Sequence, residues 1–131
     1  MNKPRDAHTV LQPVGWPRPR GYSDGIKARG ETIFVGGMIG RNPEGEFRVG
    51  LVAQARQALA NIAAVLRDCG AALTDVAKTT VFVTDIGQFA VVNAVYAEAF
   101  GDHRPARSTV QVAALPAGAE VEIEVWAYVS H

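Results

Sequence analysis

The stretch GAEVEIEVWAY, residues 118–128, decides the fold, because its side chains alternate in character along an extended chain. The apolar members fall on one face of such a strand: Val121, Ile123, Val125 and Ala127. The other face carries three carboxylates followed by two large aromatics: Glu120, Glu122, Glu124, Trp126 and Tyr128. Strict alternation predicts a strand with one face in a core. The second face fits a solvated surface, a contact surface or part of a reaction site.

The rest of the chain predicts three further main strands and two amphipathic helices around this strand. The strands are expected at 31–37, 75–85, 108–115 and about 119–129, and the helices at 51–69 and 87–100. Prolines and glycines make 12–25 a loop with extended pieces, and 116–118 a turn that pairs the last two strands. With these extended pieces the order is β-β-α-β-α-β-β. The economical arrangement is an α+β fold, a single mixed sheet with two helices packed on one face.

The apolar face of 119–129 is expected to lie under the two helices. The face with the carboxylates and aromatics then has no helix to cover it. Trp126 and Tyr128 make this face more apolar than a free surface needs, and exposed apolar patches often mark contact surfaces. The pattern therefore predicts a homo-oligomer in which another subunit covers the open face.

Composition narrows the class of protein. The length of 131 residues suits a single domain, 1–131, in which residues 1–20 form a basic, proline-rich N-terminal arm. Lys and Arg together number 13, as do Asp and Glu. This balanced net charge does not indicate binding to nucleic acid or to an acidic membrane. No secretory signal or membrane-length apolar run is visible, which favours a soluble cytoplasmic protein.

Most familiar kinds of site find no support in the motifs. The histidines at 8, 103 and 131 and the single Cys69 have no metal-ligand spacing, so no metal site is expected. Cys69 falls on the apolar stripe of the first helix, which predicts a buried structural thiol. The segment 101–107, which contains His103, reads as a solvated loop. The glycines of 35–40 match neither a phosphate loop nor a dinucleotide fingerprint.

Arg107 is the strongest candidate for chemistry that the residues themselves provide. It stands at the entrance of a strand, where its planar fork could bind a substrate carboxylate or form an ordinary surface ion pair. If the strands at 108–115 and 119–129 form a hairpin, Arg107 and Glu122–Glu124 share one small sheet. An arginine and a carboxylate close together would bind an acid and activate a water.

Four segments carry a resemblance to a known family: PARSTVQVAALPAGAEVEIE (105–124), GYSDGI (21–26), AQARQALANIAAVL (53–66) and VAKTTVFVTDIGQFAVVNAVYAEAF (76–100). Over about residues 20–129 the chain resembles the RidA (YjgF) family of reactive-intermediate deaminases. The resemblance implies a chorismate-mutase-like α+β domain and a homotrimer with active sites in clefts between subunits. It also implies cofactor-free hydrolysis of 2-imino acids, or of the enamines that pyridoxal-phosphate enzymes release, to 2-keto acids and ammonia.

The resemblance assigns roles to particular residues. Arg107 matches the arginine that grips the substrate carboxylate, and Glu122 matches the acid that activates the attacking water. The other residues that it implies in the pocket are Tyr22, from an adjoining subunit, Asn93, and the backbone around Gly36 and Thr109.

Three departures from the family pattern keep other functions open. Val35-Gly36-Gly37 stands where many enzymatic members read Ser-Gly-Gln, Thr109 replaces a cysteine, and the N-terminal loop is longer and more basic, with Trp16. One alternative is a different substrate, such as an aminomuconate-type enamine. Another is a non-catalytic trimer that binds or senses a small carboxylate. The third, an RNA-binding protein or ribonuclease, rests only on the basic arm.

Overall fold

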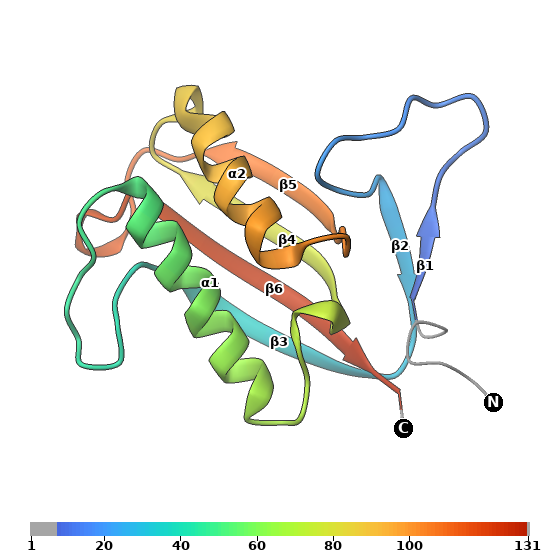
Figure 1. The fold of residues 1–131 in the computed structure, drawn as a ribbon, viewed down its shortest axis with the longest axis horizontal. Helices are drawn as coiled ribbons and strands as arrows, with labels where there is room; N and C mark the ends of the chain where they lie inside the picture. Colours follow the sequence, from blue (N-terminus) through green and yellow to red (C-terminus); the bar gives the residue numbers. More distant parts are fainter. Residues whose placement is uncertain (1–7, 131) are drawn as a thin grey trace.

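A four-stranded mixed sheet forms the centre of the molecule in the computed structural model, which describes residues 8–130 (Figure 1). Its strands are β3 (Glu31–Met38), β4 (Val76–Val83), β5 (Ala106–Gln111) and β6 (Val121–Val129), in the spatial order β3-β6-β4-β5. β6 pairs antiparallel with both β3 and β4, whereas β4 and β5 run parallel. The predicted α+β class and mixed sheet are confirmed.

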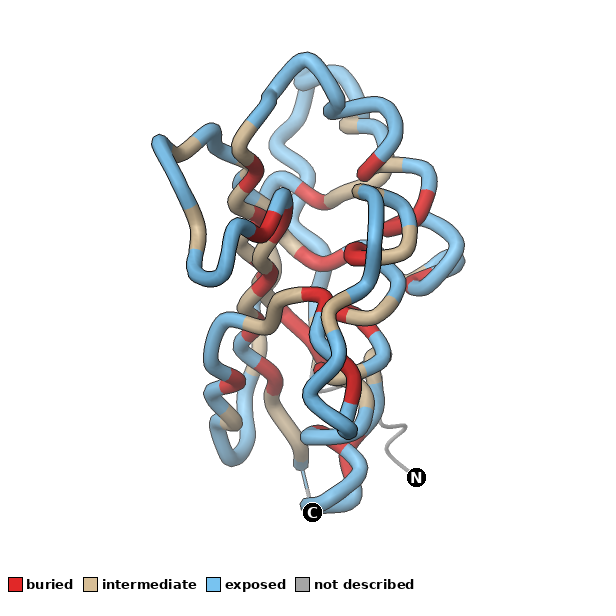
Figure 2. Tube along the Cα trace, turned by 90° about the vertical axis from the view of Figure 1, so that its left-hand side faces the viewer, coloured by how far each residue is buried: buried red, intermediate tan, exposed pale blue. Residues whose placement is uncertain are grey.

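Two helices, α1 (Leu51–Arg67) and α2 (Phe89–Phe100), cover one face of this sheet (Figure 1). α1 packs over β3 and β6. On β6 the predicted apolar face is fully buried beneath the helices: Val121, Ile123, Val125 and Ala127. Figure 2 shows the resulting mixture of short buried and exposed stretches along the chain, with exposed loops. The alternation in 118–128 therefore identified the core strand and its buried side.

Cys69 is exposed, so the prediction of a buried structural thiol is wrong. α1 ends at Arg67, before the apolar pattern does. Gly70 then adopts a positive φ of 78°, and the Ala71 N–H donates to the Leu66 carbonyl oxygen, which closes the helix end. The turn takes Cys69 off the buried stripe, and its thiol donates a hydrogen bond to the Leu66 carbonyl oxygen.

The expected hairpin between the last two strands does not form, because β4 lies between β5 and β6. β4, α2 and β5 form a strand–helix–strand unit, in which the helical crossover makes the two strands parallel neighbours. The chain after β5 then passes β4 and inserts β6 between β3 and β4. β5 is consequently an edge strand of the sheet.

A separate two-stranded sheet, β1 (His8–Leu11) with β2 (Gly25–Ala28), stands beside the β4–β5 side of the main sheet (Figure 1). These strands flank the proline-rich loop, whereas the sequence placed extended pieces within 12–25. β1 also gives structure to part of the predicted arm 1–20, of which residues 1–7 lie outside the described residues. The His8 ring nitrogen hydrogen-bonds the Asp75 carbonyl oxygen at 3.0 Å and ties β1 to the main domain.

His103 is half-buried, not part of a solvated loop as expected. Its Nε2 lies 2.7 Å from the Val76 carbonyl oxygen, and its ring lies 6.2 Å from that of His8. Burial lowers the pKa of His103 from its ordinary value of 6.5, and the hydrogen bond to Val76 offsets only part of this effect.

The pKa of His103 predicts that the protein loses stability in mild acid. Below about pH 6.5 the unfolded chain binds a proton at His103 that the folded chain does not, so the free energy of unfolding falls until pH reaches the lowered folded-state pKa. Urea unfolding between pH 8 and pH 5 measures this loss, and His103→Gln should make the profile flatter. An identical pH profile in the variant would contradict the assignment.

Candidate functional site

Arg107 points to the helix-covered side of the edge strand β5. It pairs with Thr79 of β4, whose hydroxyl is hydrogen-bonded to the Tyr96 hydroxyl of α2 at 2.9 Å. Residues paired across neighbouring strands point to the same face of a sheet. The side chain of Arg107 therefore lies between the end of the sheet and α2, and Thr109, two residues further along β5, shares that face.

Three aromatic rings surround the Arg107 guanidinium. Its carbon Cζ lies 4.7 Å from the ring centre of Tyr96, 5.2 Å from that of Tyr22 and 5.4 Å from that of Phe89. One guanidinium nitrogen donates a 2.6 Å hydrogen bond to Oδ1 of Asn93. These contacts fix the direction of the guanidinium without neutralising its charge.

The electrostatics of this cluster favour an anion. Burial lowers the pKa of Arg107, but a guanidinium keeps its proton at neutral pH. Tyr96 stays a neutral phenol, because burial raises its pKa to about 12. Within residues 8–130 no carboxylate forms an ion pair with Arg107, the one ion pair there being Arg56–Glu98. A half-buried cation without an acidic partner is an unfavourable arrangement that a bound carboxylate would relieve.

The N-terminal loop brings Tyr22 to Arg107 within the same chain. Ser23 anchors the loop at the start of β5, with its N–H donating to the Pro105 carbonyl oxygen at 3.1 Å and its hydroxyl to that of Arg104. Ser23 also forms an isolated bridge with Ala106. The resemblance implied a tyrosine from an adjoining subunit, but here one chain provides the contact by itself.

Glu122 does not lie near Arg107 in the single chain. It pairs with Phe82 of β4, and neighbours on β6 alternate between the buried face and the open face. Its side chain is therefore on the open face, opposite Arg107, and β4 separates the two strands. The expected closeness of Arg107 and Glu122 is wrong within one chain, because it depended on the hairpin that does not form.

Glu122 instead lies over the glycine pair of β3. The pairing of β3 with β6 shifts between Val35 and Met38, so Gly36 and Gly37 form a bulge. A Cβ atom on Gly37 would collide with the Glu122 carboxylate, whereas one on Gly36 would meet no atom within 4 Å. The structure thus sorts the candidate residues into an arginine group (Tyr22, Asn93, Arg107, Thr109) and a carboxylate group (Gly36, Glu122).

Gly37→Ala should displace the Glu122 carboxylate with little loss of stability, because the colliding atoms belong to the end of a flexible side chain. If Glu122 acts as the general base of a hydrolysis, the rate should fall about tenfold or more, because the base is misplaced. Gly36→Ala adds the same methyl group to the bulge where no atom of this chain lies within 4 Å, and so shows how much of the loss comes from the bulge itself and not from the displaced carboxylate. If the two variants have equal rates and equal melting temperatures, Gly37 is not what places the Glu122 carboxylate.

The sequence did not identify Phe89 and Tyr96 as site residues, because in the helix expected at 87–100 they have the spacing of an apolar, core-facing stripe. Phe89 is 39% exposed, and both rings pack on Arg107. A signal for this was present, because Phe89, Asn93 and Tyr96 follow at i, i+4 and i+7 and so share one helix face. On that face Asn93 lies between the two aromatic residues, and all three side chains contact Arg107.

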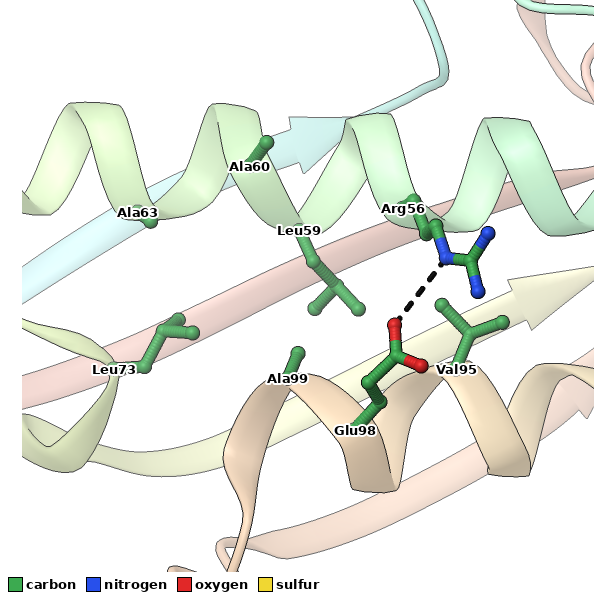
Figure 3. Close-up of a pocket in the computed structure, with 8 residues that line it drawn as sticks. All are labelled: Arg56, Leu59, Ala60, Ala63, Leu73, Val95, Glu98 and Ala99. Carbon is green, nitrogen blue, oxygen red and sulfur yellow. Dashed lines mark hydrogen bonds and ion pairs between the residues drawn. The ribbon is translucent and has the colours of Figure 1, made fainter.

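A cavity of about 220 Å³, away from the Arg107 cluster, lies between α1 and α2 (Figure 3). Alanine and leucine side chains make up most of its wall, and the Arg56–Glu98 ion pair at 3.3 Å crosses it. Arg56 and Glu98 are already paired and well exposed, so this cavity offers no chemistry comparable with the unpaired Arg107.

The described part of the chain shows neither a cluster of metal ligands nor a membrane-spanning helix. Between residues 8 and 130, no three His, Cys, Asp or Glu side chains gather in a way that could hold a metal ion. Neither helix there has the length and apolar character that a bilayer crossing needs.

Comparison with known proteins adds to this geometry. Residues 17–129 match the model of the Endoribonuclease L-PSP family. The chain is 45% identical over 107 residues to the 2-iminobutanoate/2-iminopropanoate deaminase of Escherichia coli K12, covering 79% of this chain and 83% of the relative. It is 46% identical over 115 residues to a RutC family protein of Pyrococcus horikoshii, covering 86% and 90%. The crystal structure of E. coli TdcF with bound serine superposes with a TM-score of 0.74 at 36% identity, covering 93% and 99%.

Proposed function

Because the chain belongs to the Endoribonuclease L-PSP family, which is also called the RidA/YjgF family, we propose that it hydrolyses 2-imino acids to 2-keto acids and ammonia. The substrates would be small imino acids, such as 2-iminobutanoate and 2-iminopropanoate, or the enamines from which they form. One observation carries the proposal: Arg107 is a half-buried cation held by Asn93 and three aromatic rings, with no carboxylate partner among residues 8–130.

The names of relatives agree with this substrate class. Several relatives at about 45% identity are named 2-iminobutanoate/2-iminopropanoate deaminases. TdcF, of the same fold, was crystallised with serine, a small α-amino acid. Such compounds share with a 2-imino acid a carboxylate next to a carbon that bears nitrogen.

In the proposed mechanism, Arg107 binds the substrate carboxylate through its fork and so orients the adjacent C=N carbon. Glu122 takes a proton from a water as the water oxygen bonds to that carbon and the C=N electron pair moves to nitrogen. Since the imine is protonated when water adds, the carbinolamine is neutral, and the protonated Glu122 gives its proton to the carbinolamine nitrogen. The C–N bond then breaks and ammonia leaves, while the Glu122 carboxylate takes the hydroxyl proton and the keto group forms. Water and imino acid thus give keto acid and ammonia, with no change of oxidation state.

Two chains would have to build each site, because Arg107 and Glu122 are on opposite faces of the sheet in one chain. We propose a homotrimer in which the arginine group of one subunit faces the carboxylate group of the next. The open face of the sheet supports such an assembly, since it exposes Phe34 at 67% and Trp126 at 45%, with their rings 5.0 Å apart.

A coupled assay tests the proposed activity. A pyridoxal-phosphate-dependent threonine dehydratase supplies 2-iminobutanoate, and the protein should speed 2-ketobutyrate release and reduce trapping of the imine by semicarbazide. If several imino acids show no acceleration, the deaminase proposal fails. Binding of a small carboxylate without turnover, seen as thermal stabilisation, would instead identify a carboxylate-binding module.

A further inference from the structure

A cavity of about 560 Å³ adjoins the Arg107 cluster beneath the N-terminal loop. Tyr22, Phe89 and Asn93 line it, and the same three residues contact Arg107. If Arg107 binds the carboxylate of a ligand, the rest of that ligand can therefore extend into this cavity. Its volume exceeds what the side chain of a three- or four-carbon imino acid would fill.

The outer wall of the cavity is basic and aromatic. The loop contributes Trp16, Arg18 and Arg20. Neither arginine forms an ion pair within residues 8–130. Asp24 also lines the cavity, so its charged groups sum to about one positive charge, separate from that of Arg107.

The loop is held in this position by several contacts. The Gln12 side-chain amide donates to the Trp16 carbonyl oxygen at 3.1 Å, and the Trp16 N–H donates to the Pro13 carbonyl oxygen at 3.2 Å. Gly21, at a φ of 74°, lies close enough that a Cβ would be 3.5 Å from the Asn93 amide. The prolines at 17 and 19 limit the backbone freedom that ordering must remove.

We propose that this cavity binds a second acidic group, so that the preferred substrates are 2-imino acids with a carboxylate on the side chain. Arg107 holds the α-carboxylate, and Arg18 and Arg20 hold the side-chain carboxylate, with Trp16 and Phe89 around the carbon chain between them. This inference rests on the proposed role of Arg107, and it extends that role to the class of side chain.

Calorimetry with two stable product-like acids tests the inference apart from turnover. The native protein should bind 2-oxoglutarate about fivefold more tightly than 2-oxobutanoate, as expected for a partly exposed ion pair. In the double variant Arg18→Gln/Arg20→Gln the ratio of the two affinities should fall to about one. Lys27→Gln/Arg29→Gln removes the same charge from exposed residues that do not line the cavity, and should keep the native ratio.

Kinetics then distinguish the two proposals. The imine of aspartate, supplied by an aspartate oxidase, should be hydrolysed with a higher kcat/KM than 2-iminobutanoate. Turnover of both with no preference, or a preference that survives in the Arg18/Arg20 variant, would overturn the inference and leave the deaminase proposal intact. A preference in binding without turnover would overturn the deaminase proposal alone, and failure of both acids to bind together with no turnover of either imine would overturn both.

Discussion

Arg107→Ala should lower kcat/KM for 2-imino acids by about a hundredfold or more, which is the loss expected when one member of a buried, hydrogen-bonded charge pair is removed. The variant deletes the only part of the aromatic cluster that can bind a carboxylate with two parallel hydrogen bonds. The coupled dehydratase assay measures the loss.

Arg107→Lys provides the matched control for charge. The lysine keeps a cation but loses the planar fork and its packing on the rings, so its rate should fall between those of the native protein and Arg107→Ala. Melting temperatures and assembly size must be unchanged for the comparison to stand. Full activity in Arg107→Ala would show that Arg107 does not bind the substrate carboxylate, and the proposed substrate class would lose its basis.

Glu122→Gln should lower kcat by about a hundredfold or more while product-like acids still bind, because an amide cannot take the proton of the attacking water. Its shape fits the same place over Gly37, so the structure of β6 should not change. Isothermal titration with 2-oxobutanoate separates binding from chemistry.

The result for Glu124→Gln makes the Glu122 prediction specific. Glu124 is on the same open face of β6, two residues further along, and is half-buried like Glu122. Its position on β6 is opposite the bulge, but the atoms nearest to a Cβ on Gly37 belong to the Glu122 carboxylate. The rate of Glu124→Gln should stay near that of the native protein. If both glutamates matter equally, or if Glu122→Gln is fully active, Glu122 has a structural role and some other group activates the water.

The sequence was informative wherever a local pattern determines the structure. The alternation in 118–128 identified β6 and its buried face, and helical spacing located α1 and α2 to within two residues at each end. Arg107 was found because a strand entrance after Pro105 is a rigid place for a side chain. These features depend on neighbours in the sequence, so periodicity reveals them.

The strand order and the division of the site could not be seen in the same way. Nothing local says that β5 pairs with β4 and not with the following β6, because that choice depends on how α2 packs between distant segments. The predicted hairpin between the last two strands placed Arg107 and Glu122 side by side, whereas in the structure they are on opposite faces of the sheet, with β4 between their strands. Cys69 was misplaced for a related reason, since apolar spacing continued past the point where the backbone at Gly70 turned away.

Mixing two inactive variants tests most directly whether Arg107 of one chain works with Glu122 of another. Arg107→Ala and Glu122→Gln subunits are unfolded, mixed in equal amounts and refolded together, and the assembled protein is assayed for imine hydrolysis. If each site takes its arginine and its glutamate from different chains, about a quarter of the sites regain both groups, and activity should return to about a quarter of the native level. Mixed assemblies with no more activity than either variant alone would contradict the account.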